Sequence, residues 1–150
     1  MKTLIDVNRV FSLAFGSEEG YVASVITEVD IVEAETRFLR PVLGDALYDA
    51  LSRGAYAQLM DEYVAPMLAL WTRFVVEPSL AMRCCGCMSR GAISEARNDY
   101  DRRAYRALQM RAAAYSRRLT DYLNANGNSF PEYDAKSNFL NRCLFYGNII

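Results

Sequence analysis

The feature that most constrains this fold is a row of apolar residues spaced three or four positions apart, the spacing that places side chains on one face of an α-helix. The row lies within residues 92–124, and Asn126 with Gly127 follows it as a natural helix stop. The pattern therefore predicts one long helix over about 92–124. Its predicted core face consists of Ala104, Leu108, Ala112, Tyr115, Leu119, Tyr122 and Leu123.

Shorter helices are predicted in the first third of the chain. Thr27 followed by Asp30, or Asp30 followed by Glu33, fits an N-cap with an acidic residue three positions later, so a helix should begin at one of these two positions. We expect Pro41 to interrupt this helix, because proline lacks an N–H and restricts the residue before it. A second short helix is predicted over about 43–52, with Gly54 as its stop.

A second long helical segment is predicted over about 55–88. Pro66 either starts a new helix at its first turn or kinks a continuous one, and Pro78 should add a further kink. Gly86 and Gly91 break the pattern before the next helix. Two long helices joined by a short break predict an antiparallel hairpin of about 55–88 and 92–124.

The fold class that follows is all-α: a helical bundle built on this hairpin, with shorter flanking helices, in a single domain over 1–150. Residues 1–26 are expected to form an N-terminal arm, in which residues 4–15 are either a short helix or extended. A last short helix is predicted over 137–146. A chain of 150 residues buries roughly 70% of its unfolded surface, so it needs no metal or disulfide to hold a core.

The composition argues against most enzyme classes and against a membrane protein. The chain has no histidine, which removes the commonest general base and the commonest metal ligand. No stretch has about 18 consecutive apolar residues, and Asp6, Asn8 and Arg9 break any signal-peptide core. We therefore expect no enzyme activity, no cofactor and no metal, in a reducing cytoplasm.

The cysteines are the densest group of reactive side chains, with Cys84, Cys85 and Cys87 close together and Cys143 far away in sequence. A four-cysteine zinc site would need two such pairs, and a nucleophilic cysteine would need a base. We therefore expect the cysteines to act as small, buried apolar side chains where two helices pack closely. A thiol-redox role remains an alternative hypothesis.

Charge is segregated along the chain, although the net charge is only −1. Residues 1–82 carry a net charge of −6 and residues 83–118 a net charge of +6. Arginine forms bidentate pairs with carboxylates and phosphates and suits interfaces better than lysine does. Three readings stay open: an ordinary solvated face, a subunit interface, or a nucleic-acid contact. The candidate interface or DNA-channel residues are Arg97, Arg102, Arg103, Arg106, Arg111, Arg117 and Arg118.

One local motif is more specific than these general patterns. A turn between two predicted helices reads Pro-x-x-Gly-Asp-x-Leu-Tyr, with Pro41, Gly44, Asp45 and Tyr48 as its candidate structural residues. Together with Glu33-Ala34-Glu35, Tyr63, Trp71 and Phe130-Pro131, the turn resembles small helical head–tail connector (adaptor) proteins of tailed bacteriophages. The variants most similar to it are those in phages and prophages of gut Bacteroidales.

The resemblance covers residues 27–133 and implies a structural virion-assembly protein. Such a subunit assembles into a ring, often twelvefold, beneath the portal protein and receives the next tail or stopper protein. DNA passes through the ring as cargo, at the head–tail interface of a virion assembled in the host bacterial cytoplasm. The resemblance also makes residues 134–150 a candidate tail for docking on the portal. The alternative function is a helical nucleic-acid-binding protein that uses the arginine-rich helix 97–118.

Overall fold

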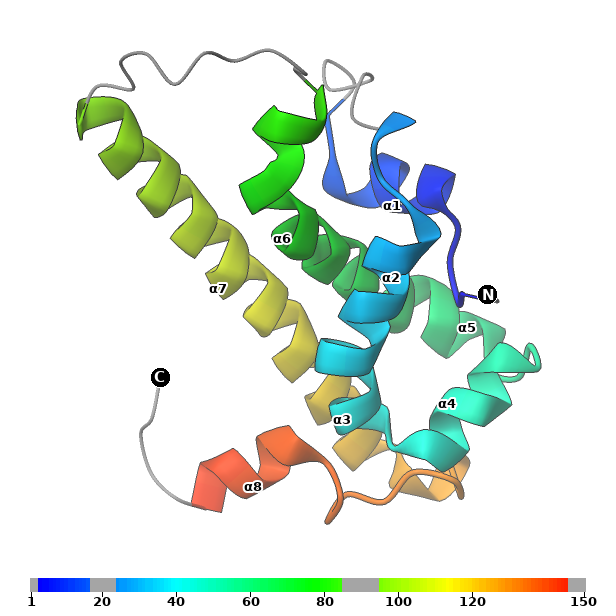
Figure 1. Cartoon of the computed structure of the whole chain (residues 1–150). Helices are drawn as coiled ribbons and strands as arrows, with labels where there is room; N and C mark the ends of the chain where they lie inside the picture. The colour runs from blue at the N-terminus through cyan, green and yellow to red at the C-terminus, as the bar shows by residue number, and fades with distance from the viewer. Residues whose placement is uncertain (1–2, 17–23, 85–94, 146–150) are drawn as a thin grey trace.

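The computed structural model describes residues 3–16, 24–84 and 95–145, and within these ranges the protein is all-helical (Figure 1). The predicted all-α class is thereby confirmed. The elements in chain order are α1 (Val7–Ala14), α2 (Glu28–Ala34), a π-helical turn η2 (Glu35–Leu39), α3 (Arg40–Leu43), α4 (Asp45–Ser52), α5 (Ala57–Leu59), a second π-helical turn η3 (Met60–Val64), α6 (Ala65–Cys84), α7 (Glu95–Ala125), a 3-10 turn η4 (Gly127–Ser129) and α8 (Phe139–Phe145).

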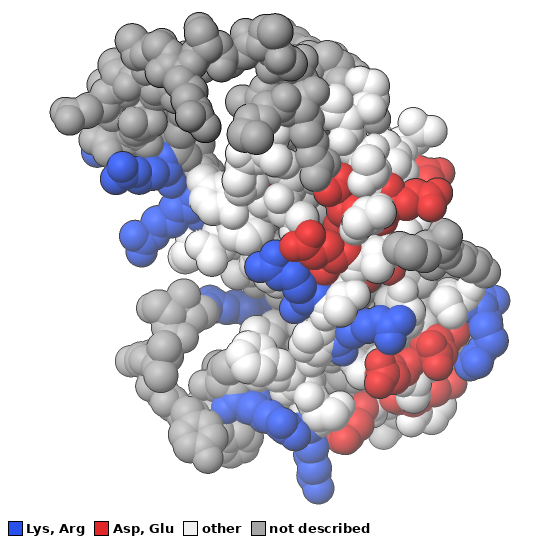
Figure 2. Space-filling view, viewed as in Figure 1, with Lys and Arg blue, Asp and Glu red and all other residues white. Residues whose placement is uncertain are grey.

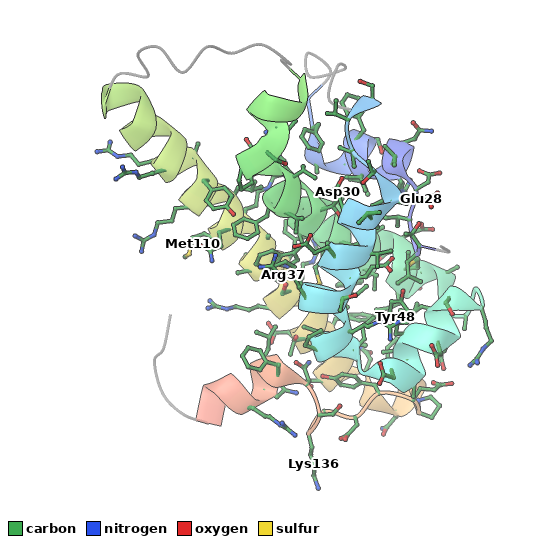
Figure 3. The ribbon with its side chains drawn as sticks, in the orientation of Figure 1. Glu28, Asp30, Arg37, Tyr48, Met110 and Lys136 are labelled. Carbon is green, nitrogen blue, oxygen red and sulfur yellow. The ribbon has the colours of Figure 1, made fainter. Side chains whose placement is uncertain are left out.

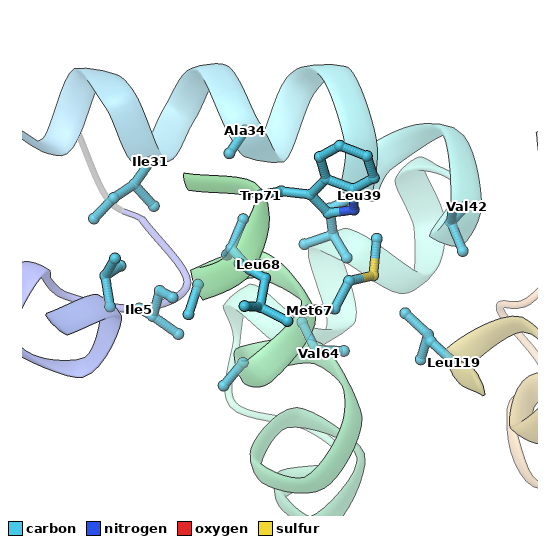
Figure 4. Close-up of a cluster of buried hydrophobic side chains, with 14 of the residues drawn as sticks. Ile5, Ile31, Ala34, Leu39, Val42, Val64, Met67, Leu68, Trp71 and Leu119 are labelled. Carbon is cyan, nitrogen blue, oxygen red and sulfur yellow. The ribbon is translucent and has the colours of Figure 1, made fainter. Parts of the chain in front are cut away.

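The centre of the fold is α6, which is packed on several sides by other helices (Figure 1). Residues 67–72 are all buried, and they meet apolar side chains from α1, α2 and α7. Figure 4 shows this meeting point, with Ile31 from α2, Leu68 from α6 and Leu119 from α7 in one cluster. A helix that is apolar on all its faces is stable in water only when its neighbours cover it, so α6 determines where the other helices pack.

Aromatic rings from η2 and from α7 also pack on α6. Phe38 stacks on Trp71 at 3.8 Å between ring centroids, and Phe74 stacks on Tyr105 at 4.5 Å. Trp71 also donates its indole N–H to the hydroxyl of Ser116 over 2.9 Å, in a buried hydrogen bond. The paired aromatic faces and this satisfied polar contact fix α7 against α6.

The start of α2 is capped by Thr27, which is the first of the two predicted N-cap positions. The Thr27 backbone N–H and hydroxyl both donate to the Asp30 carboxylate, at 2.8 and 2.9 Å. Asp30 is 4% exposed, and the acid lies in the first turn, where the helix dipole favours negative charge. These contacts hold the first turn of α2.

Pro41 does not interrupt the first helix, which corrects the sequence prediction. The helical path runs through η2 and α3 as far as Leu43 and ends at Gly44. The reason is the π turn just before the proline, where the Arg40 N–H bonds to the carbonyl of Glu35, five residues back. The wider turn relieves the clash that a proline ring makes with an α-helical carbonyl.

The same arrangement recurs at Pro66. The π turn η3 precedes it, the Ala65 N–H bonds to the Met60 carbonyl, and Pro66 lies in the first turn of α6. Pro78 lies inside α6. Each π turn thus ends two residues before a proline, which lets α5, η3 and α6 run on as one helical path.

Three further predictions can be compared with the structure. Residues 7–14, which the sequence left as helix or extended, form α1 and bury Val10 and Ala14. Ala104 was expected in the core face of α7 but is exposed, because the neighbouring Tyr105 makes the contact with α6 at that turn. The break at Gly86 and Gly91 lies outside the described residues, so the long hairpin is not confirmed as a whole.

Within the described ranges, no helix is both long enough and apolar enough to cross a membrane.

A substitution in the buried face of α7 should destabilise the fold far more than one on its exposed face. Leu119 is fully buried and Met110 is 55% exposed on the same helix. We expect Leu119→Ala to lower the free energy of unfolding by about 2–5 kcal/mol, because it leaves a cavity. Met110→Ala should change it by less than about 0.5 kcal/mol. Urea denaturation followed by circular dichroism measures both, and equal effects would contradict the packing of α7 on α6.

Candidate subunit interface and its supporting turn

The motif turn is built around a backbone conformation that favours glycine. Gly44 has φ +76° and ψ 162°, a region that other residues adopt only under strain. Its N–H bonds to the Arg40 carbonyl at 2.8 Å, and its own carbonyl accepts from the Tyr48 N–H at 3.1 Å. Gly44 is therefore both the C-cap of α3 and the N-cap of α4.

Side chains of the same turn close around Arg40. Its guanidinium lies over the Tyr48 ring, 4.0 Å from the centroid, and donates to Asp45 at 3.2 Å. Asp45 is in the first turn of α4, where a carboxylate is favoured by the helix dipole. The structure thus brings Gly44, Asp45 and Tyr48 into one compact unit, with Pro41 in the first turn of α3.

A buried carboxylate joins this turn to the N-terminal segment. Glu35 is 2% exposed and accepts two hydrogen bonds of 2.7 Å, one from the Tyr48 hydroxyl and one from the Leu4 backbone N–H. The sequence analysis did not find this role. A signal was present, because Glu35 lies between Ala34 and Phe38 on the apolar face of its helix.

Burial and the neighbouring Glu35 carboxylate raise the pKa of Tyr48 from its ordinary 10.0 to about 12. Burial is the larger cause, and the hydrogen bond to Glu35 adds to it because it favours the protonated hydroxyl. The hydroxyl therefore stays protonated as the donor to Glu35 across the neutral range.

The predicted interface arginines lie on α7, which corresponds to the predicted long helix. The side chain of Arg97 is outside the described part of the structure. The other six are all exposed: Arg102, Arg103, Arg106, Arg111, Arg117 and Arg118. Their exposure follows from the helix period, since Ala112, Leu119 and Leu123 occupy the opposite, buried face.

Two of these arginines interact within the chain. Arg118 places its guanidinium 5.1 Å from the centroid of the Tyr63 ring, and Arg102 has a further contact of its own. For Arg103, Arg106, Arg111 and Arg117 the described residues provide no carboxylate partner.

The surface reflects the charge segregation of the sequence. In Figure 2, basic side chains lie over α7 along the left side of the molecule, and acidic side chains lie mainly over the right half. Four ion pairs of the acidic half join Arg9 to Asp61, Arg37 to Glu33, Arg40 to Asp45 and Arg73 to Glu77. Four arginines of the first half are thus paired with nearby carboxylates. On α7, the arginines without a carboxylate partner among the described residues form an exposed positive surface: Arg103, Arg106, Arg111 and Arg117.

Two tyrosines in the described part of α7 pack at the edge of the core. Tyr105 stacks on Phe74, and Tyr122 stacks on Tyr63 with 4.1 Å between ring centroids. Their ring faces are therefore occupied by the chain's own aromatic residues, and these two are not a free platform for stacking bases.

Beyond the end of α7, the following loop and α8 form an open cleft of about 750 Å³. Its apolar part includes Leu123 and Tyr133, and Lys136 and Arg142 contribute positive charge. The buried Asn138 ties the loop to α7, because its amide donates to Thr120 at 3.3 Å and to Tyr133 at 2.8 Å. Phe139, at the start of α8, is 58% exposed beside this anchored segment.

Most of the cysteine cluster falls on residues that the structure does not describe: Cys85 and Cys87 lie outside the described ranges, and Cys84 ends α6. Among the side chains that are described, no group of three potential metal ligands comes together. The thiol-redox hypothesis therefore stays a prediction.

Comparison with known proteins gives one match. The model of a family described as a family of unknown function (DUF6712) matches residues 39–142. This range is well over half of the 150-residue chain, and it includes the turn from Pro41 to Tyr48 and the whole of α7. No curated protein and no solved structure matches the chain.

Removing the Tyr48 hydroxyl should destabilise the protein in a pH-dependent way. Tyr48→Phe leaves Glu35 without one of its buried donors, so we expect a loss of about 1–3 kcal/mol at neutral pH. Because the folded pKa lies above the unfolded one, this contribution is complete below pH 10 and is lost as the pH rises through 12. Urea denaturation at several pH values should show the two proteins converging in that window.

The control for that experiment is Tyr115→Phe, which removes a half-buried tyrosine hydroxyl with no partner among the described residues. A destabilisation by Tyr48→Phe no larger than that of Tyr115→Phe would contradict the role assigned to the Glu35 contact.

Glycine should be required at position 44 but not at position 127. Gly44→Ala must hold a strained backbone, so we expect a loss of about 1–3 kcal/mol in unfolding free energy. A Cβ at Gly127 would meet no atom within 4 Å, and its φ is not in the left-handed region. We therefore expect less than about 0.5 kcal/mol for Gly127→Ala. Thermal unfolding of both variants tests the difference, and a Gly44→Ala protein as stable as wild type would contradict the turn geometry.

Proposed function

We propose that this chain, which belongs to the family of unknown function DUF6712, is a structural virion-assembly protein with no catalytic site. In this proposal it is a subunit of a phage head–tail connector ring that docks on the portal protein and receives a tail or stopper protein. The fold contributes two long helical segments that pack on each other, the helical path 57–84 and α7, with shorter helices around them. In the proposal these two segments form the antiparallel hairpin.

The observation that carries the proposal is the exposed positive surface of α7 formed by Arg103, Arg106, Arg111 and Arg117. A helix held rigidly by Leu119, Leu123 and the Trp71–Ser116 hydrogen bond presents arginines to solvent on its other side. Acidic side chains lie mainly on a different part of the surface (Figure 2). Identical copies with such a charge distribution attract one another head to tail, and head-to-tail contacts generate rings when the rotation closes.

The turn from Pro41 to Tyr48 supports the same proposal, because it carries the resemblance to connector proteins and lies within the matched family segment. In the structure it is tied to the N-terminal segment through Glu35 and Leu4. The turn therefore stabilises the subunit and leaves the arginines available for contacts.

The segment 134–150 is the proposed docking element for the portal. Its described part is anchored to α7 by Asn138, and it exposes Phe139 beside the cleft lined by Lys136 and Arg142. An exposed aromatic residue with cations nearby is a typical anchor of a protein–protein interface. Phe139 would then contact the portal, while α7 faces the neighbouring subunits or the DNA channel.

The alternative function is a nucleic-acid-binding protein that uses the exposed arginines of helix 97–118. Arginines in a row on one helix could contact phosphates, and DNA binding would then weaken steeply with salt. Binding of DNA by the free chain at micromolar concentration or tighter would favour this alternative. The connector proposal expects DNA only as passing cargo, with no comparable affinity of the free subunit.

Co-expression with a portal protein from the genome that encodes this chain tests the proposal. We expect the full chain to co-purify with the portal and to appear as an additional ring in electron micrographs. Phe139→Asp should weaken this association at least tenfold, because it places a charge in the proposed apolar contact. Asn128→Asp, an exposed change in the loop after α7, is the matched control and should leave binding unchanged.

Thermal unfolding shows whether the Phe139→Asp protein is folded; since Phe139 is 58% exposed, we expect it to be. Failure of the wild-type chain to associate with the portal would overturn the proposal. Normal association of Phe139→Asp would overturn the role of the docking segment.

A further inference from the structure

Large apolar side chains are strongly exposed at three places in the described part of the chain: Val29, Met110 and Phe139, at 65%, 55% and 58%. Phe139 belongs to the docking segment already described. Val29 and Met110 lie on two different helices, and each is surrounded by charges of one sign. Their surroundings suggest that the two surfaces fit each other.

The surface around Met110 is a row along the outer side of α7. Arg103, Arg106, Met110 and Arg117 follow one another at steps of three, four and seven, so they share one face of the helix. We call these four residues the basic ridge. Ala107 and Ala114 lie on either side of Met110 in sequence and are exposed too. The middle of the basic ridge therefore carries apolar side chains, and its two ends carry arginines. An apolar centre with a charged margin is the usual anatomy of an interface.

The surface around Val29 is the outer side of α2. Glu28 precedes Val29, and Glu33 lies one turn further along; all three are exposed. We call these three residues the α2 face. The helix beneath it is rigidly placed, because Ile31 and Ala34 are fully buried and the contacts between Thr27 and Asp30 hold its first turn.

One carboxylate of the α2 face, that of Glu33, can change partner at low cost. Glu33 pairs with Arg37 at 2.6 Å, but both side chains are about half exposed, at 46% and 54%. Exposed pairs of this kind contribute at most about 1 kcal/mol. Glu33 can therefore exchange or share this partner with an arginine of another molecule without a large loss of stability.

The two surfaces lie on different sides of the molecule. In Figure 3, Met110 projects from α7 on the left, whereas Glu28 lies on α2 to the right, with α6 between the two helices. One copy therefore cannot join its own basic ridge to its own α2 face. Two copies can, and each contact leaves one ridge and one α2 face unoccupied at the ends, so the same contact can repeat.

We propose that the basic ridge of one copy binds the α2 face of the next copy. Val29 packs against Met110 and the neighbouring alanines, and the ridge arginines pair with Glu28 and Glu33. The proposal rests on the ring-forming function proposed above and names its subunit contact.

Reversing the side-chain charges on each surface, separately and together, tests this contact. The ridge variant carries Arg106→Glu and Arg117→Glu, the face variant carries Glu28→Lys and Glu33→Lys, and the combined variant carries all four. Self-association of the full chain is measured by sedimentation velocity from micromolar to millimolar concentration. We expect wild type to associate, each two-site variant to associate at least tenfold more weakly, and the combined variant to recover most of the lost affinity.

Arg53→Glu is the control for a change of net charge alone, because Arg53 is an exposed arginine at the end of α4 and belongs to neither surface. It should associate as wild type does. Met110→Asp adds a test of the apolar centre, with Gln109→Asp, at the adjacent exposed position of α7, as its matched control. Circular dichroism and thermal unfolding establish that each variant is folded before association is compared.

Several outcomes would overturn the contact: a wild-type chain that stays monomeric up to millimolar concentration, a ridge variant that associates normally, or a combined variant that recovers nothing. Portal binding of the same variants separates this inference from the proposed function. If wild type binds the portal and the ridge variant does so with the same stoichiometry, only the subunit contact is wrong. If wild type never binds the portal, but the combined variant recovers the self-association that each two-site variant loses, the connector function is wrong and the contact between copies stands.

Discussion

The packing of α6 against its neighbours is the interaction on which the rest of the structure depends. Residues 67–72 are buried all around this helix, so no single partner could cover it. α1, α2 and α7 each place one apolar face on it, and the remaining face of each of these helices is left for solvent. The positions of the exposed arginines of α7 and of the α2 face are therefore consequences of the same core.

The buried polar side chains in the described core have hydrogen-bond partners, and these hydrogen bonds favour one arrangement of the helices over others. Trp71 donates to Ser116 between α6 and α7, and Glu35 accepts from Tyr48 and Leu4 between the motif turn and the N-terminus. A buried polar group without its partner costs free energy, so each of these contacts penalises alternative packings. The result is a chain whose surfaces are held in fixed relative positions, as the proposed contacts between identical copies would require.

The two π turns allow a helix to continue past a proline. Both occur just before a proline, and in both the residue preceding the proline bonds to the carbonyl five residues back. A proline in a plain α-helix would disrupt the helix at that point. The π turns keep α2 continuous with α3, and α5 with α6. As a result, Gly44 rather than Pro41 ends the first helical path.

The sequence by itself determined the all-α class and the ends of several helices, because these depend on local periodicity and capping. Thr27, Gly54 and Asn126 mark helix ends through properties of the residues themselves. Only the tertiary structure decided that Glu35 is buried, that Tyr105 rather than Ala104 faces α6, and that Met110 and Glu28 lie on different sides of the molecule. These facts depend on contacts between residues far apart in the chain, and a helical period gives the face of each helix but not the neighbour that covers it.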